Sequence, residues 1–159
     1  MPIIETKNPI NENLILLLRI IAGLVWLGTV FRRLGPNQGD FEDRIISMGE
    51  GTTILPESIM EFAIDQWFLL YLLVISIEII SSFSLLTGTL SRGGALLATV
   101  NGFAIGMAGI GLGIIDLIIP WSVAFITLFL FLFTHPGLYK GFDGKLVNKN
   151  LPSFVSKFI

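Results

Sequence analysis

Apolar residues gather into four long runs along the chain, separated by polar segments. Each run is long enough to cross the hydrocarbon core of a membrane as an α-helix, which takes about 20 apolar residues. Continuous apolar runs indicate helices rather than the alternating pattern of a membrane β-barrel. The pattern therefore predicts spanning helices over about 14–31, 67–90, 95–115 and 121–134. The predicted fold is an all-α membrane protein, a four-transmembrane-helix bundle forming a single domain over 1–159.

The connections between the four runs differ in length. The first is a long acidic loop over about 32–66, predicted to lie outside the cytoplasm. Within it, "PESIMEFAI" has Pro56 at a plausible first helical turn, so this stretch is either a short interfacial helix or an ordinary loop. The segments "TGTLSRGG" and "DLIIPW" are predicted as short turns, with Pro120 opening the fourth helix.

Positive charge favours one side of the predicted bundle. With four spans, both termini and the turn at Arg92 lie on one side, together with the lysines of a basic tail over 135–159. The positive-inside rule predicts a multi-pass protein of the cell membrane with both termini in the cytoplasm. The opening "MPIIETKNPINEN" lacks the cationic start of a secretory signal, so we expect the first run to stay in the mature protein.

Composition supports the membrane prediction and limits the chemistry. The chain is 53% hydrophobic and 14% charged, whereas soluble domains are about a quarter charged. It has no cysteine and one histidine, His135, so iron–sulfur clusters, covalent haem attachment and bis-histidine haem within one chain are excluded. We expect no metal or haem here, and nothing indicates nucleic-acid binding. Redox work would need a quinone, a substrate or a partner subunit.

Strongly polar residues interrupt three of the predicted helices. Counted from the cytoplasmic side at the helical rise, Arg19 is roughly 9 Å, Asn101 roughly 12 Å and Glu78 roughly 18 Å deep. We expect these three side chains to form one cluster, with Ser82 adding a donor one turn beyond Glu78. The cluster either locks the helices together or forms a pocket for a quinone head group, in which Glu78 relays protons.

Two further features suggest binding or packing. Arg32 and Arg33 end the first helix, where they are either anchors at the membrane interface or a site for a small dianion. The third helix carries glycine pairs four residues apart, including Gly102 and Gly106. Such pairs allow close helix approach, either within the bundle or to another subunit.

Three segments together resemble the DoxX/DoxD family of four-helix membrane proteins. They are "LLLRIIAGLVWLGTVFRRL", "IEIISSFSLLTGTLSRGGALLA" and "HPGLYKGFDGKL", in this order, within about 14–146. The elements that carry the resemblance are Arg19, Gly23, Gly28, Glu78, Gly88, Arg92, Gly137, Tyr139 and Asp143. The length and the extended first loop are most similar to the DoxD subunits of archaeal thiosulfate:quinone oxidoreductases.

The resemblance implies a function in sulfur metabolism and the respiratory chain of an archaeal thermoacidophile. A protein of this kind oxidises thiosulfate to tetrathionate, reduces a membrane quinone of the caldariella quinone type, and works with a DoxA-like second subunit. We then expect Glu78 and Arg19 to be catalytic, Arg19, Glu78, Asn101 and Ser82 to hold the quinone, and Arg32 and Arg33 to bind thiosulfate. The alternative is a non-catalytic accessory subunit of a terminal quinol oxidase complex.

Overall fold

The computed structural model describes residues 10–35, 39–50, 56–110, 114–146 and 158, and these residues form helices and short connections without a strand. Chain order gives seven helices within this part: α1 (Glu12–Leu34), α2 (Gly39–Glu50), α3 (Glu57–Asp65), α4 (Trp67–Thr87), α5 (Ser91–Ala108), α6 (Ile114–Phe133) and α7 (Asp143–Leu146).

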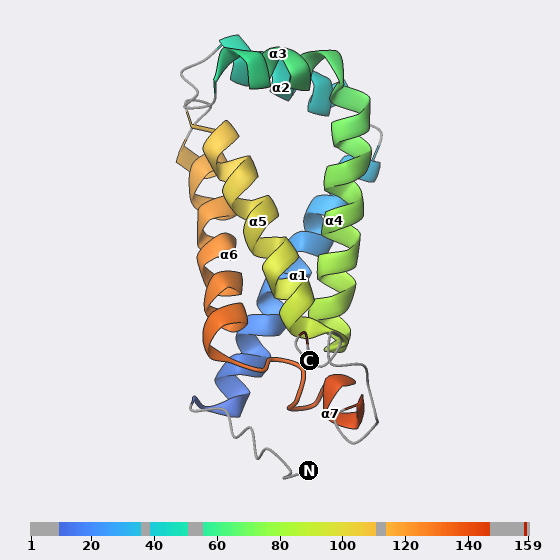
Figure 1. Ribbon diagram of the computed structural model, residues 1–159, viewed down its shortest axis with the longest axis vertical. Helices are drawn as coiled ribbons and strands as arrows, with labels where there is room; N and C mark the ends of the chain where they lie inside the picture. Colours follow the sequence, from blue (N-terminus) through green and yellow to red (C-terminus); the bar gives the residue numbers. More distant parts are fainter. Residues whose placement is uncertain (1–9, 36–38, 51–55, 111–113, 147–157, 159) are drawn as a thin grey trace.

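Four long helices pack lengthwise against one another, and the shorter helices lie at the two ends of this bundle (Figure 1). α1 packs against α4 and α6, and α5 packs against the same two helices, so the four form a closed ring. α2 and α3 lie across one end, where they contact each other and α4. α7 lies at the opposite end, near the α4–α5 turn. Of the two interpretations of "PESIMEFAI", the helix is the one observed, as α3.

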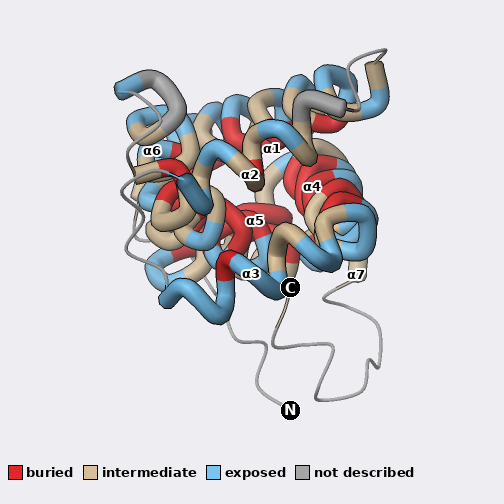
Figure 2. The backbone as a smooth tube through the Cα atoms, turned by 90° about the horizontal axis from the view of Figure 1, so that it is seen from above, coloured by how far each residue is buried: buried red, intermediate tan, exposed pale blue. Residues whose placement is uncertain are grey.

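The apolar residues of the bundle face both inward and outward. On α1, Ile15, Ala22, Trp26 and Val30 are buried along one stripe. Leu14, Leu17, Leu24 and Phe31 lie on other faces of this helix and are about half exposed or more. Seen from the end of the bundle, buried positions surround its middle and exposed positions lie outside (Figure 2). The outer surface is therefore apolar over much of its length.

Two helices of the described chain are long and apolar enough to cross a membrane. Glu12–Leu34 and Trp67–Thr87 have mean hydropathies of 2.4 and 2.2 over their most apolar windows, of which 33% and 39% are buried within the protein. Leu117–Phe133 is a shorter apolar stretch. Since most residues in both windows are not buried, these helices differ from the core helices of a soluble protein.

The helix boundaries around the predicted turn "TGTLSRGG" are set partly by contacts from elsewhere in the chain. α4 ends at Thr87 and is capped by Gly88, which has a left-handed φ of 68° that favours glycine. α5 begins at Ser91, four residues before the predicted start. The carboxylate of Asp143 accepts hydrogen bonds from the backbone N–H groups of Leu90 and Ser91, at 2.6 and 2.9 Å. Asp143 therefore caps α5 from a segment far away in the sequence.

The predicted turn at "DLIIPW" is wrong. α5 ends at Ala108 and α6 begins at Ile114, so Pro120 lies inside α6 rather than at its start. The break between the two helices falls within a glycine-rich stretch, of which 111–113 lie outside the described residues. Glycine weakens a helix by about 1 kcal/mol per residue relative to alanine, so several close together favour a break.

The glycines of α5 serve packing within the bundle. A Cβ atom placed on Gly102 would lie 2.9 Å from the Cβ of Ala124, and one on Gly106 would lie 2.7 Å from Nε1 of Trp121. Both neighbours belong to α6. Of the two roles open to this glycine face, close approach within the bundle is the one seen.

Candidate functional site

A cavity of about 500 Å³ lies in the half of the bundle next to α2 and α3. The main apolar core, which includes Ile15, Leu85 and Leu130, fills the half near the α4–α5 turn. At the other end, Ile105 on α5, Gly109 directly after α5 and Ile119 on α6 line the cavity. The walls are mainly apolar, and the polar or charged residues lining them are Thr29, Arg32, Arg33, Arg44, Glu78 and Asn101.

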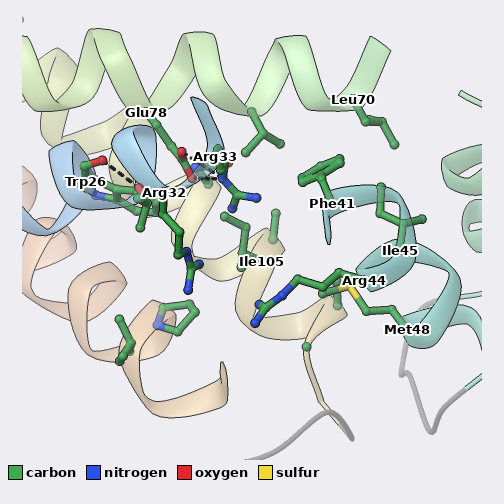
Figure 3. Close-up of a pocket in the computed structure, with 18 of the residues that line it drawn as sticks. Trp26, Arg32, Arg33, Phe41, Arg44, Ile45, Met48, Leu70, Glu78 and Ile105 are labelled. Carbon is green, nitrogen blue, oxygen red and sulfur yellow. Dashed lines mark hydrogen bonds and ion pairs between the residues drawn. The ribbon is translucent and has the colours of Figure 1, made fainter. Parts of the chain in front are cut away.

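A buried ion pair stands in the wall of this cavity. Nε of Arg33 lies 3.1 Å from each carboxylate oxygen of Glu78, and the two side chains are 12% and 0% exposed (Figure 3). The hydroxyl of Tyr71 donates to the carbonyl oxygen of Arg33 at 3.1 Å, and the guanidinium lies 5.1 Å from the ring centre of Phe41. Contacts from α2 and α4 therefore hold Arg33, at the end of α1, against Glu78.

The prediction that Arg19 joins Glu78 and Asn101 in one cluster is wrong. Glu78 pairs with Arg33 instead. Arg19 and Arg33 are 14 positions apart on α1, about 21 Å at the helical rise. Side chains on a helix lean toward its N-terminus. In the antiparallel pair of α1 and α4, this lean brings Arg33 and Glu78 toward each other and turns Arg19 away.

Arg19 is bound instead to the chain segment that follows α6. Its guanidinium donates to the carbonyl oxygens of Pro136 at 2.7 Å, Lys140 at 3.3 Å and Tyr139 at 3.5 Å. The side chain is 1% exposed and lies against Gly88, where an added Cβ would be 2.6 Å from Nη1. Arg19 is absent from the cavity wall, and its contacts hold the C-terminal segment to the bundle.

Several residues that carry the family resemblance meet at this end of the protein. Asp143 is fully buried and, besides capping α5, accepts a hydrogen bond from the hydroxyl of Ser91 at 2.6 Å. Its own N–H donates to the carbonyl oxygen of Gly88 at 2.8 Å. Gly137 packs directly against the carboxylate of Asp143. This cluster joins α1, the α4–α5 turn and α7, and its contacts are structural.

Two other arginines extend into the cavity. Arg32 reaches in from α1 and Arg44 from α2 (Figure 3). Among the lining residues, three arginines accompany a single carboxylate, Glu78, which is paired with Arg33. The cavity wall therefore holds two arginines, Arg32 and Arg44, besides the one that pairs with Glu78.

The remaining predicted site residues divide between the cavity and the core. Asn101 lines the cavity with Glu78, as expected for a shared pocket. Ser82 is buried but does not line it, and its hydroxyl donates to the carbonyl oxygen of Ile79 at 3.0 Å. Within the described chain, no group of three or more acidic or histidine side chains lies close enough together to hold a metal ion.

The sequence analysis missed α2 and with it Arg44. Phe41, Ile45 and Met48 recur at helical spacing in the segment treated as a loop, and all three line the cavity (Figure 3). Arg44 lies on the same helix face, three residues after Phe41. This spacing of apolar residues could have predicted α2 from the sequence.

No protein-family model, curated protein or solved structure matches the chain.

Proposed function

We propose that the protein is the membrane subunit of a thiosulfate:quinone oxidoreductase, with the quinone held in the cavity. The single observation that carries this proposal is the buried Arg33–Glu78 pair in the wall of a mainly apolar cavity of about 500 Å³. Cavities of this size and character suit small amphipathic ligands. A quinone ring with part of its isoprenoid tail matches both the apolar walls and the few polar groups.

The proposal places α1, α4, α5 and α6 across the membrane as four spanning helices. The support is the exposed apolar surface of the bundle and the two long apolar helices. In this orientation the start of α1, the α4–α5 turn and α7 face the cytoplasm, where Lys140 and Lys145 fit the positive-inside rule. α2 and α3 then cover the cavity on the opposite side of the cell membrane.

Thiosulfate would bind in the cavity at Arg32 and Arg44. This changes the sequence-based expectation, which paired Arg32 with Arg33. The guanidinium of Arg33 is engaged with Glu78, and Arg32 and Arg44 are the other two arginines of the cavity wall. Guanidinium groups hold small oxyanions through charge-assisted hydrogen bonds.

The proposed reaction balances without a metal. Two thiosulfate dianions lose one electron each and join through a new sulfur–sulfur bond as tetrathionate. The quinone accepts the two electrons and two protons and leaves as quinol. Glu78 is the ionisable carboxyl group in the cavity wall, so its proposed role is to pass protons to the quinone oxygens. The proposed partner is a DoxA-like second subunit, and the proposed quinone is of the caldariella type.

The test is thiosulfate-dependent reduction of decylubiquinone by the protein in nanodiscs, purified with its copurifying subunits and alone. Glu78→Gln should lower kcat by about 100-fold or more, the range typical of a lost proton-transfer group. Glu61→Gln, at an exposed position on α3, is the matched control and should retain the wild-type rate. Wild-type complex that binds quinone but never oxidises thiosulfate would overturn the proposal and favour the accessory role in a quinol oxidase.

A further inference from the structure

Two buried hydrogen-bond donors in the cavity wall have no acceptor among the described residues. They are the indole Nε1 of Trp26 on α1 and the amide Nδ2 of Asn101 on α5. The two residues are 3% and 5% exposed. Glu78, on α4, stands in the wall of the same cavity. Three helices therefore bring polar groups to one apolar space.

Unpaired donors of this kind are rare in folded proteins, because a buried N–H group that has left water normally finds an acceptor. The indole N–H can only donate, so Trp26 requires an acceptor from outside its own side chain. The buried Nε1 of Trp121 also has no partner among the described residues, but Trp121 does not line the cavity. Position in the cavity wall therefore distinguishes Trp26 and Asn101.

We infer that Trp26 and Asn101 form a donor subsite for a carbonyl oxygen of the ligand in this cavity. The inference rests on the proposed quinone function and specifies which groups recognise the quinone ring. A carbonyl oxygen has two lone pairs and can accept from two donors. Both donors are uncharged and lie among apolar residues, which suits a neutral carbonyl better than an anion such as thiosulfate. In the proposed function, the anion binds at Arg32 and Arg44 instead.

The same reasoning gives Trp26 and Asn101 a positioning role. A quinone carbonyl held between α1 and α5 would keep the ring in the cavity that Glu78 also lines. Proton transfer requires such a fixed approach, because the donor must come within hydrogen-bond reach of the acceptor oxygen. The rival occupant of the subsite is an ordered water, which would satisfy both donors without a ligand.

Binding of duroquinone to the protein in nanodiscs tests the inference, with Trp26→Phe and Asn101→Leu as variants. Each substitution removes one hydrogen-bond donor. Trp26→Phe keeps an aromatic ring, and Asn101→Leu keeps a side chain of similar shape. Each should weaken duroquinone binding about fivefold, the effect of one neutral hydrogen bond. The infrared carbonyl stretch of the bound quinone, lowered in the wild type by hydrogen bonding, should return toward its value in hexane. Trp121→Phe is the matched control and should change neither quantity.

The possible results separate this inference from the proposed function. If the wild type binds duroquinone while both variants keep the wild-type affinity and carbonyl frequency, the donors serve water and the inference is overturned, although the quinone cavity stands. If the wild type binds no quinone, the proposed function and the inference both fail. Durene, which has the same carbon skeleton without carbonyl groups, should bind the wild type and both variants equally weakly.

Discussion

Arg33 and Glu78 face each other between α1 and α4, with the arginine Nε 3.1 Å from both carboxylate oxygens and Glu78 fully buried. Removing one partner leaves the other charge buried without compensation, which typically costs about 3–5 kcal/mol. Arg33→Gln alone should therefore lower the unfolding temperature strongly in detergent. The double variant Arg33→Gln, Glu78→Gln should recover a large part of that loss. A double variant no more stable than the single one would show that the pair does not act as a unit.

Arg19 should govern the C-terminal segment rather than the cavity. Arg19→Lys keeps the charge but cannot reach the three carbonyl oxygens that the guanidinium binds. Hydrogen exchange should become faster at the amides of Leu90, Ser91 and Asp143, while quinone affinity stays within twofold of the wild type. If quinone binding were lost while amide hydrogen exchange stayed unchanged, Arg19 would act at the ligand site, contrary to this prediction.

Asp143 should stabilise the start of α5. Its carboxylate accepts from two backbone N–H groups and from the hydroxyl of Ser91. Asp143→Asn keeps one acceptor oxygen but loses the charge at the helix N-terminus, so it should destabilise the protein by about 1–2 kcal/mol in thermal unfolding. Asp43→Asn, at an exposed position on α2, is the control and should be close to neutral. Equal effects of the two variants would argue against capping by Asp143.

Gly102 should tolerate no larger residue, because α6 lies directly against it. Gly102→Val places side-chain atoms where Ala124 already lies, and overpacking of this kind costs about 1–3 kcal/mol. Gly28→Ala is the matched helical control, since an added Cβ there would meet nothing within 4 Å. Its unfolding temperature should stay the same or rise, as alanine favours helix. A stable Gly102→Val variant would contradict the close α5–α6 packing.

Arg32 and Arg44 should control the apparent affinity for thiosulfate. The double variant Arg32→Gln, Arg44→Gln should raise KM for thiosulfate at least about tenfold, since hydrogen bonds to charged groups are worth more than neutral ones. Lys145→Gln changes an exposed cation at the opposite end of the bundle and should leave KM unchanged. An unchanged KM in the double variant would remove the anion site from the cavity.

Hydropathy was sufficient to find the long helices, and the depth of the polar residues was sufficient to find part of the cavity. All four predicted helices have counterparts in α1, α4, α5 and α6. Glu78, Asn101, Arg32 and Arg33 line one cavity. These features depend on local apolar periodicity and on distance along a helix, both of which a single sequence contains.

The partners of the charged residues could not be found from depth alone. Arg19 and Glu78 are within two helical turns of each other in depth. Side chains lean toward the N-terminus of their helix, however, so Glu78 pairs with Arg33. The carbonyl oxygens that bind Arg19 and the carboxylate that caps α5 come from the segment after α6. Long-range contacts of this kind leave no local pattern in the sequence.

Photolabelling by an azidoquinone tests most directly whether the cavity holds a quinone. The protein in nanodiscs would be illuminated with the probe, with and without excess decylubiquinone, and the labelled residues identified by mass spectrometry. The account predicts label on cavity-lining residues such as Trp26, Val74 and Ile105, lost when decylubiquinone competes. Label confined to outward-facing residues such as Phe83 and Leu97, and unaffected by competition, would contradict it.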